Sequence, residues 1–169
     1  MTRSANDQYH RSVPLLLALI DQAFDRQSWH GTNLGGSIRG VTAAQAAWRP
    51  GRGRHNIWEL VVHAAYWKYA VRRRLTGEAR GSFPLRGSNW FVKPERGRVR
   101  EADWKADVAL LIDTHRTLRR AIAALGPAQL GTHARGGTTT VGALVSGIAA
   151  HDLYHAGQIQ LLKRLRSSR

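Results

Sequence analysis

The sequence predicts an all-α protein, a four-helix bundle with long connecting loops. Three observations predict this fold. Apolar residues recur at steps of three and four in four separate segments, no segment shows a convincing strand pattern, and the chain has no internal repeat. At 169 residues, of which 43% are hydrophobic, the chain is long enough to bury a core. We therefore expect a single helical domain over residues 1–169.

The first long helix is expected from about Pro14 to Trp29, because Pro14 suits a first turn and apolar residues after it share one face. Residues 1–12 are polar, and we expect them to be flexible. The loop 31–36 ends this helix. After it, Thr42 begins a capping-box pattern that predicts a short helical turn.

Three further long helices follow. Asn56 is a good N-cap for the second, and Gly77 stops it. The third is expected over residues 101–125. Either Thr138 or Thr139 is expected to cap the fourth, which continues close to the end of the chain.

Residues 77–100 form a long loop rich in glycine, arginine and proline. Irregular connections of more than about 12–15 residues are usually functional or mobile in compact domains. Two interpretations stay open, a cover over a pocket and a disordered insertion. Phe83, Trp90 and Phe91 favour at least partial packing.

Composition excludes some classes of site. Cysteine is absent, so disulfides, thiolate metal sites and a cysteine nucleophile are excluded, and any metal ligands are nitrogen or oxygen atoms. The apolar run 13–20 is shorter than the roughly 18 residues of a membrane span, and no small-residue cleavage site follows it. We expect a cytoplasmic protein that has no membrane partner.

The formal net charge is +15, and arginine supplies most of the positive charge. Such a charge attracts polyanions, so a basic helical protein that binds nucleic acid, without catalysis, is the alternative function. The arginines are scattered, however, and no aromatic-basic recognition motif accompanies them. We favour the other interpretation of the charge, a genome-level bias towards arginine codons, with the arginines spread over solvated surfaces and loops.

His151 and His155 are the best clue to function. Residues at i and i+4 project from the same face of a helix, so both imidazoles can face one cation. They lie on the predicted inward seam, which reads Val141, Leu144, Ile148, His151, His155, Gln158, Leu162 and Leu165. A buried imidazole or amide without a partner costs about 1–3 kcal/mol. A divalent cation would satisfy both histidines, and Gln158 would support a ligand from behind.

His63, on the second long helix, is the natural third ligand. Three nitrogens with an open position are typical of a catalytic metal site, which acidifies a bound water. Glu59, one turn earlier, would hold that imidazole or act on the water, although an exposed helical glutamate is the commoner fate. His115 lies on the inward seam of the third helix and is a rival ligand, but we favour His63. The histidines in termini and loops, His10, His30, His55 and His133, give no comparable signal.

The stretches 57–67 and 147–159, which contain these histidines, resemble the DinB family of bacterial metalloproteins. Residues 47–50 are similar to the family's short link before its second helix. The resemblance implies a four-helix bundle that binds a divalent metal, often nickel or zinc, through one histidine of helix two and an HxxxH pair of helix four. It therefore implies His63, His151 and His155 as the metal ligands.

The family resemblance also implies a small-molecule substrate. Relatives include transferases and isomerases that use small thiols, so we expect a metal-dependent hydrolase or a thiol-dependent transferase, or a member that binds metal without catalysis. Glu59 and Gln158 are the candidates to orient the reacting group, and no residue stands out as a general base. Family members are commonly homodimers. Leu15, Leu19 and Val145 lie off the main seams, where they suit either a dimer contact or a broad core.

Overall fold

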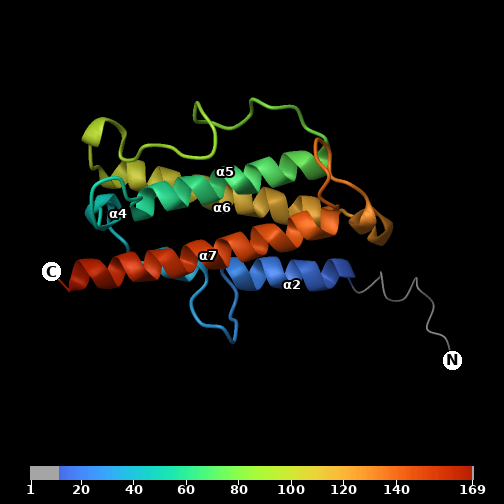
Figure 1. Cartoon of the computed structure of the whole chain (residues 1–169), viewed down its shortest axis with the longest axis horizontal. Coiled ribbons are helices and arrows are strands. Elements are labelled where there is room, and N and C mark those ends of the chain that lie inside the picture. Colours follow the sequence, from blue (N-terminus) through green and yellow to red (C-terminus); the bar gives the residue numbers. More distant parts are fainter. Residues whose placement is uncertain (1–11, 169) are drawn as a thin grey trace.

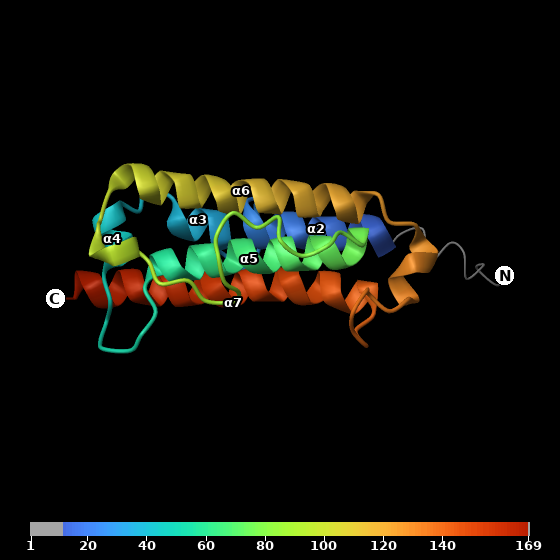
Figure 2. The same cartoon turned by 90° about the horizontal axis from the view of Figure 1, so that it is seen from above.

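The computed structural model describes residues 12–168, and four long helices dominate this part of the chain. Figures 1 and 2 show them lying side by side as a bundle. They are α2 (Ser12–Phe24), α5 (Ile57–Thr76), α6 (Glu101–Ala123) and α7 (Val141–Ser167). Between Ser12 and Ser168 there is no strand, only an isolated bridge between His133 and Thr140. The predicted all-α bundle is confirmed.

The direction of the helices explains the long loop. Figure 1 shows α5 and α6 running in the same direction, whereas α2 and α7 run the opposite way. The connection between α5 and α6 therefore has to return along the length of the bundle. Residues 77–100 make this return beside α5, and their only helical turn is η1 (Glu95–Gly97).

Four short elements complete the part of the chain that the structure describes: α3 (Leu34–Ile38), α4 (Ala43–Ala47), η1 and η2 (Pro127–Gly131). The capping box predicted at Thr42 is confirmed. The Thr42 side chain accepts a hydrogen bond from the backbone amide of Gln45, and the Gln45 side chain accepts one from the backbone amide of Thr42. The predicted loop 31–36 is wrong in part, because Asn33 caps the short helix α3 by accepting from the amide of Gly36 at 2.9 Å.

The predicted helix limits need three corrections. The second long helix is capped by Asn56 and ends at Gly77 as expected. By contrast, α2 ends at Phe24 rather than Trp29, whose side chain is 96% exposed. The cap of α7 is Thr140, because the backbone carbonyl of Thr139 is already bonded to the amide of Ala134. The third long helix ends at residue 123, two residues before the expected limit.

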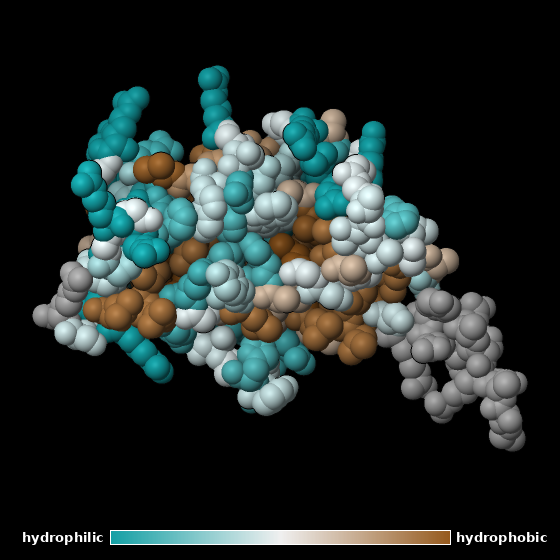
Figure 3. Space-filling model, viewed as in Figure 1, coloured by the Kyte–Doolittle hydropathy of each residue, from teal (hydrophilic) through white to brown (hydrophobic). Residues whose placement is uncertain are grey.

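The flexible segment expected over residues 1–12 falls outside the described residues for positions 1–11, and Ser12 is already the first residue of α2. Leu15 and Leu19 are exposed, and Figure 3 shows apolar surface over α2. Val145 is completely buried, so the structure removes it from the candidate dimer contacts.

From Ser12 to Ser168, no helix is both long and apolar enough to cross a membrane.

A fully buried ion pair joins α5 to α7. The ammonium of Lys68 contacts the carboxylate of Asp152, and both side chains are 0% exposed. The same ammonium lies 3.4 Å from Nδ1 of His115 and 4.9 Å from the centre of the Phe24 ring. Removing either partner would leave the other buried without its opposite charge. The pair therefore favours the one alignment of α5 and α7 that keeps the two groups in contact.

A second polar network anchors the long loop. Lys93, at the end of the loop, forms an ion pair with Asp107 of α6 at 2.9 Å. The same carboxylate accepts a hydrogen bond from the indole of Trp58 at 2.6 Å. The backbone carbonyl of Lys93 accepts from the side chain of Asn56 at 2.8 Å. The loop is therefore packed against the bundle, and the interpretation of 77–100 as a disordered insertion is wrong.

Candidate metal centre

Three imidazoles from two helices converge at one point in the bundle. His63 comes from α5, and His151 and His155 come from successive turns of α7. The Nε2 atom of His151 lies 3.1 Å from Nε2 of His63 and 3.0 Å from Nε2 of His155. The potential ligand atoms of all three residues lie within 4.8 Å of one another. This cluster can hold a metal ion.

The local sequence explains the convergence. His151 and His155 are four residues apart, so α7 presents both on one face. His63 reaches the same point from α5. The buried Lys68–Asp152 pair lies next to the cluster in sequence, since Asp152 follows His151 and Lys68 is five residues after His63. The ion pair thus fixes the two helices in the alignment that brings the imidazoles together.

Hydrogen bonds on the far side of two rings set their orientation. Nδ1 of His63 donates to the backbone carbonyl of Asn89 at 2.8 Å, and Nδ1 of His155 faces the amide oxygen of Gln158 at 2.7 Å. A carbonyl oxygen can only accept, so the protons lie on Nδ1 and the Nε2 lone pairs face the cluster. Among the described residues, the buried Nδ1 of His151 has no hydrogen-bond partner.

The long loop supplies one wall of the cluster. The indole of Trp90 lies between two imidazoles, stacked on His63 with ring centres 3.9 Å apart and on His55 at 3.6 Å. Asn89 adopts a left-handed backbone conformation, with φ of 64°. Its side-chain oxygen accepts from the indole of Trp67 at 3.0 Å. The Asn89–Trp90 turn therefore covers and orients His63 together.

Burial keeps the three imidazoles neutral. It lowers the pKa of His151 to about 3 and that of His155 to about 4, and each of these rings is further disfavoured as a cation by its neighbours in the cluster. Burial also lowers the pKa of His63, against the opposing hydrogen bond to Asn89. At neutral pH the rings are uncharged, and His63 and His155, whose protons lie on Nδ1, each leave an Nε2 lone pair for a cation.

Glu59 is not part of the cluster. Its carboxylate accepts from the guanidinium of Arg49 at 2.8 Å and from the backbone of Lys93 at 3.3 Å, and it lies 3.1 Å from Nδ1 of His55. Burial alone would raise the pKa of Glu59, but hydrogen bonds from Arg49 and His55 hold it below its usual value. The carboxylate is buried rather than exposed, and Asn89, not Glu59, holds the His63 ring.

His115 also lies outside the cluster. It is buried in the bundle, where its ring stacks on Phe24 with centres 3.7 Å apart. Burial, aided by the nearby Lys68 ammonium, lowers its pKa to about 3. His115 is thus a core histidine in van der Waals contact with an aromatic ring, and the cluster contains His63 instead.

Sequence reasoning missed the loop residues of the site. Asn89 and Trp90 lie in a segment without helical periodicity, and His55 is a loop histidine with no spacing signal. One usable signal was the concentration of aromatic residues in an otherwise polar loop. Gln158, by contrast, was identified from the helical seam, and it lies where that pattern places it, beside His155.

Comparison with known proteins adds one finding. Residues 27–159 match the family model DinB_2, described as the DinB superfamily. The matched range includes all three histidines and the whole of the long loop. Searches among curated proteins and among solved structures gave no significant match.

Proposed function

The chain belongs to the DinB superfamily, and from that premise we propose that His63, His151 and His155 hold one divalent cation at a reactive centre. The convergence of their Nε2 atoms carries this proposal. Neutral imidazoles with lone pairs directed at one point form a favourable site for a cation. Without a cation, the facing nitrogens lie about 3 Å apart but carry too few protons for every one of them to be hydrogen-bonded.

The distances support a shared ion. A first-row transition-metal cation lies about 2.0–2.1 Å from an imidazole nitrogen that binds it. Two nitrogens that bind the same cation are therefore roughly 3.0–3.4 Å apart. The separations of 3.1 and 3.0 Å from His151 agree with this range. The donor set, with no cysteine in the chain, suits nickel or zinc, and we propose one of these.

The proposed activity is hydrolysis, or transfer of a small thiol to an electrophile. A bound divalent cation would supply Lewis acidity, which lowers the pKa of a coordinated water or thiol. The chain's own residues do the rest. Asn89 and Gln158 hold two rings in place, and Trp90 shields one face of His63 from water. His151 is only partly buried and marks the side from which a small-molecule substrate approaches.

Elemental analysis of protein purified without an affinity tag tests this function. We expect about one nickel or zinc per chain, loss of the metal in His151→Ala and His155→Ala, and strongly weakened binding in His63→Ala. His115→Ala is the matched control, because it removes a buried histidine outside the cluster. Metal-free wild-type protein, or loss of metal only in the His115 variant, would contradict the proposal.

Activity is tested separately with small thiols and electrophiles, comparing wild type with His155→Ala. If the wild-type protein binds metal but turns over none of these substrates, it is a metal-binding protein without this chemistry.

We also propose a cytoplasmic homodimer that buries Leu15 and Leu19 of α2, which are 63% and 42% exposed. Light scattering on wild type and a Leu15→Lys variant tests the dimer, since a charge at a buried contact would dissociate it.

A further inference from the structure

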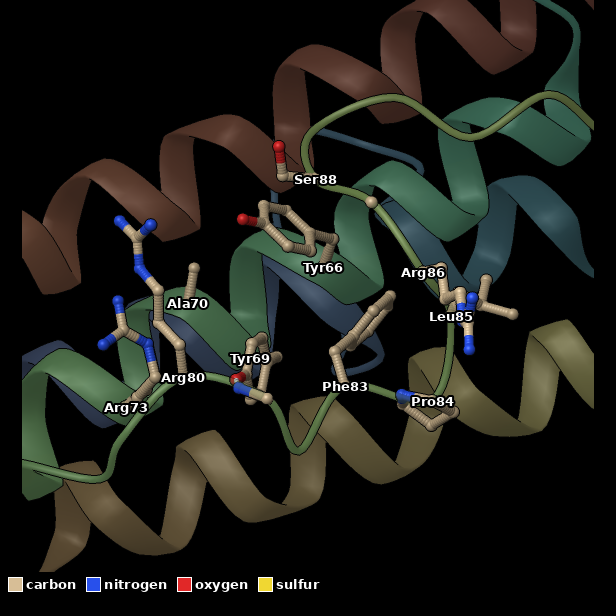
Figure 4. Close-up of a pocket in the computed structure, with 12 residues that line it drawn as sticks. Tyr66, Tyr69, Ala70, Arg73, Arg80, Phe83, Pro84, Leu85, Arg86 and Ser88 are labelled. Atoms are coloured by element: carbon tan, nitrogen blue, oxygen red, sulfur yellow. Dashed lines mark hydrogen bonds between the residues drawn. The ribbon is translucent and has the colours of Figure 1, made fainter.

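A cavity of about 350 Å³ lies between α5 and the long loop, separate from the imidazole cluster (Figure 4). Figure 4 shows Arg73 and Arg80 towards one end, Arg86 towards the other, and the rings of Tyr66, Tyr69 and Phe83 between them. The cavity therefore combines cationic ends with an aromatic wall.

The charge around this cavity is unbalanced. Residues 72–88 contain five arginines and one acidic residue, Glu78. The Glu78 carboxylate is already engaged, because Arg72 pairs with it at 2.7 Å and the hydroxyl of Ser82 donates to it at 2.6 Å. Its oxygens are therefore held by Arg72 and Ser82, neither of which lines the cavity.

None of the three arginines that line the cavity forms an ion pair, although Arg73 lies near enough to Glu78 to help lower the pKa of that carboxyl group. Arg73 donates only to the backbone carbonyl of Glu78, at 3.5 Å. Neither Arg80 nor Arg86 makes a hydrogen bond or an ion pair with any residue from Ser12 to Ser168. Guanidinium groups gathered at one cavity repel each other, and a carboxylate or phosphate oxygen would relieve that repulsion through charge-assisted hydrogen bonds.

The aromatic wall is ordered by its own contacts. The ring of Phe83 lies 5.4 Å from the ring of Tyr66 and 5.3 Å from that of Tyr69. The hydroxyl of Tyr69 accepts a hydrogen bond from the amide of Gly81 at 3.2 Å, which ties the loop to α5. These rings offer a preformed surface for a flat apolar group.

We propose that this cavity binds a small organic anion, in which a carboxylate or a phosphate monoester is joined to a flat apolar group. Arg73 and Arg80 hold the anionic end, and Tyr66, Tyr69 and Phe83 contact the apolar end. Tyr66 and Arg73 are seven residues apart on α5, about 10 Å along the helix, which sets the length of ligand that spans both. The site does not depend on a metal at the imidazole cluster.

Calorimetric titration at physiological ionic strength tests the site with three probes: naphthalene-2-carboxylate, 2-naphthyl phosphate and the uncharged naphthalene-2-carboxamide. We expect one anion per chain, with the amide at least about tenfold weaker. Arg80→Gln should lower anion affinity by at least about tenfold and leave amide binding unchanged. Arg80 is exposed, so this change spares the fold, and Arg73→Gln should give the same selective loss.

Arg52→Gln is the matched control, because Arg52 is an exposed arginine that does not line this cavity. Preferential binding of either anion supports the proposal and identifies the headgroup. Equal affinity for the amide and the anions overturns it. So does an unchanged Arg80 variant, or an equal loss in the Arg52 variant, which would mean attraction to the overall positive charge alone.

Discussion

Trp90 stacks on His63 with their ring centres 3.9 Å apart and their planes inclined by only 12°. A residue of the long loop thus covers a residue of the bundle's interior. Because Asn89 also holds Nδ1 of His63, this two-residue turn determines both the orientation of the imidazole and its contact with solvent.

Replacing Trp90 should loosen the proposed metal site without destroying it. In Trp90→Ala, His63 loses its cover, and we expect metal to pass to a competing chelator about tenfold faster, as for other groups that support a ligand. Trp90→Phe should keep most of the stacking. The rate of metal transfer is followed with a coloured chelator. Trp29→Ala, at a fully exposed indole, is the control, and equal rates in Trp90→Ala and wild type would show that the stack has no such role.

Gln158 should tune metal affinity through His155. Gln158→Leu removes the oxygen that faces Nδ1 of His155, so we expect an affinity about 10–100-fold lower for zinc or nickel. Gln158→Glu restores an acceptor and should return affinity to within a few-fold of wild type. Competition with a chelator of known affinity measures both. Gln160→Leu on the same helix is the control, and a loss as large in that variant would point to damage to α7 instead.

The Lys68–Asp152 pair should behave as a unit in unfolding experiments. Lys68→Met leaves a buried carboxylate unpaired, and we expect a loss of about 3–5 kcal/mol in the free energy of unfolding. The double variant Lys68→Met with Asp152→Leu should recover most of that loss. Urea unfolding measures each variant. The exposed Arg116–Asp113 pair is the comparison, where Arg116→Ala should cost less than about 1 kcal/mol.

His115 should make the protein less stable in acid. Its folded-state pKa is about 3, below the unfolded value of about 6.5, so between these values the unfolded chain binds the extra proton. Stability is therefore present above the unfolded pKa and is lost as the pH falls through this window. His115→Phe removes the titrating group while keeping an aromatic ring beside Phe24. We expect its unfolding free energy to depend less steeply on pH, by up to about 1.4 kcal/mol per pH unit.

Urea unfolding at a series of pH values measures this difference between the variant and wild type. Subtracting the two curves cancels the contributions of titrating groups that do not interact with His115. Parallel curves for the two proteins would show that His115 does not titrate with unfolding.

The sequence predicted the long helices because their apolar residues repeat with the helical period. It did not predict α3, since two of the five residues of that helix are glycines, or the end of α2, where helix-forming residues continue after Phe24. The common direction of α5 and α6 was also hidden. Periodicity shows which face of a helix is buried, but it does not show which neighbour buries it.

The site was predictable where it lies on helices. The spacing of His151 and His155 follows from helix geometry, whereas the choice of His63 over His115 required a family resemblance. Glu59 looked like a site residue because it lies one turn before His63, but Arg49 and His55 occupy its oxygens. Lys68 and Asp152 gave no signal, because charged residues are ordinarily assigned to the surface and only three-dimensional packing pairs them in the core.

The shared direction of α5 and α6 has a consequence for how this protein can change. The three histidines belong to long helices, while the residues that cover His63, and most of those that line the arginine-rich cavity, belong to a crossing segment that carries little of the bundle's core. Substitutions in that segment can therefore alter ligand preference while the imidazole cage keeps its shape. We therefore expect differences in substrate preference to arise from residues 77–100, while the three imidazoles keep their arrangement.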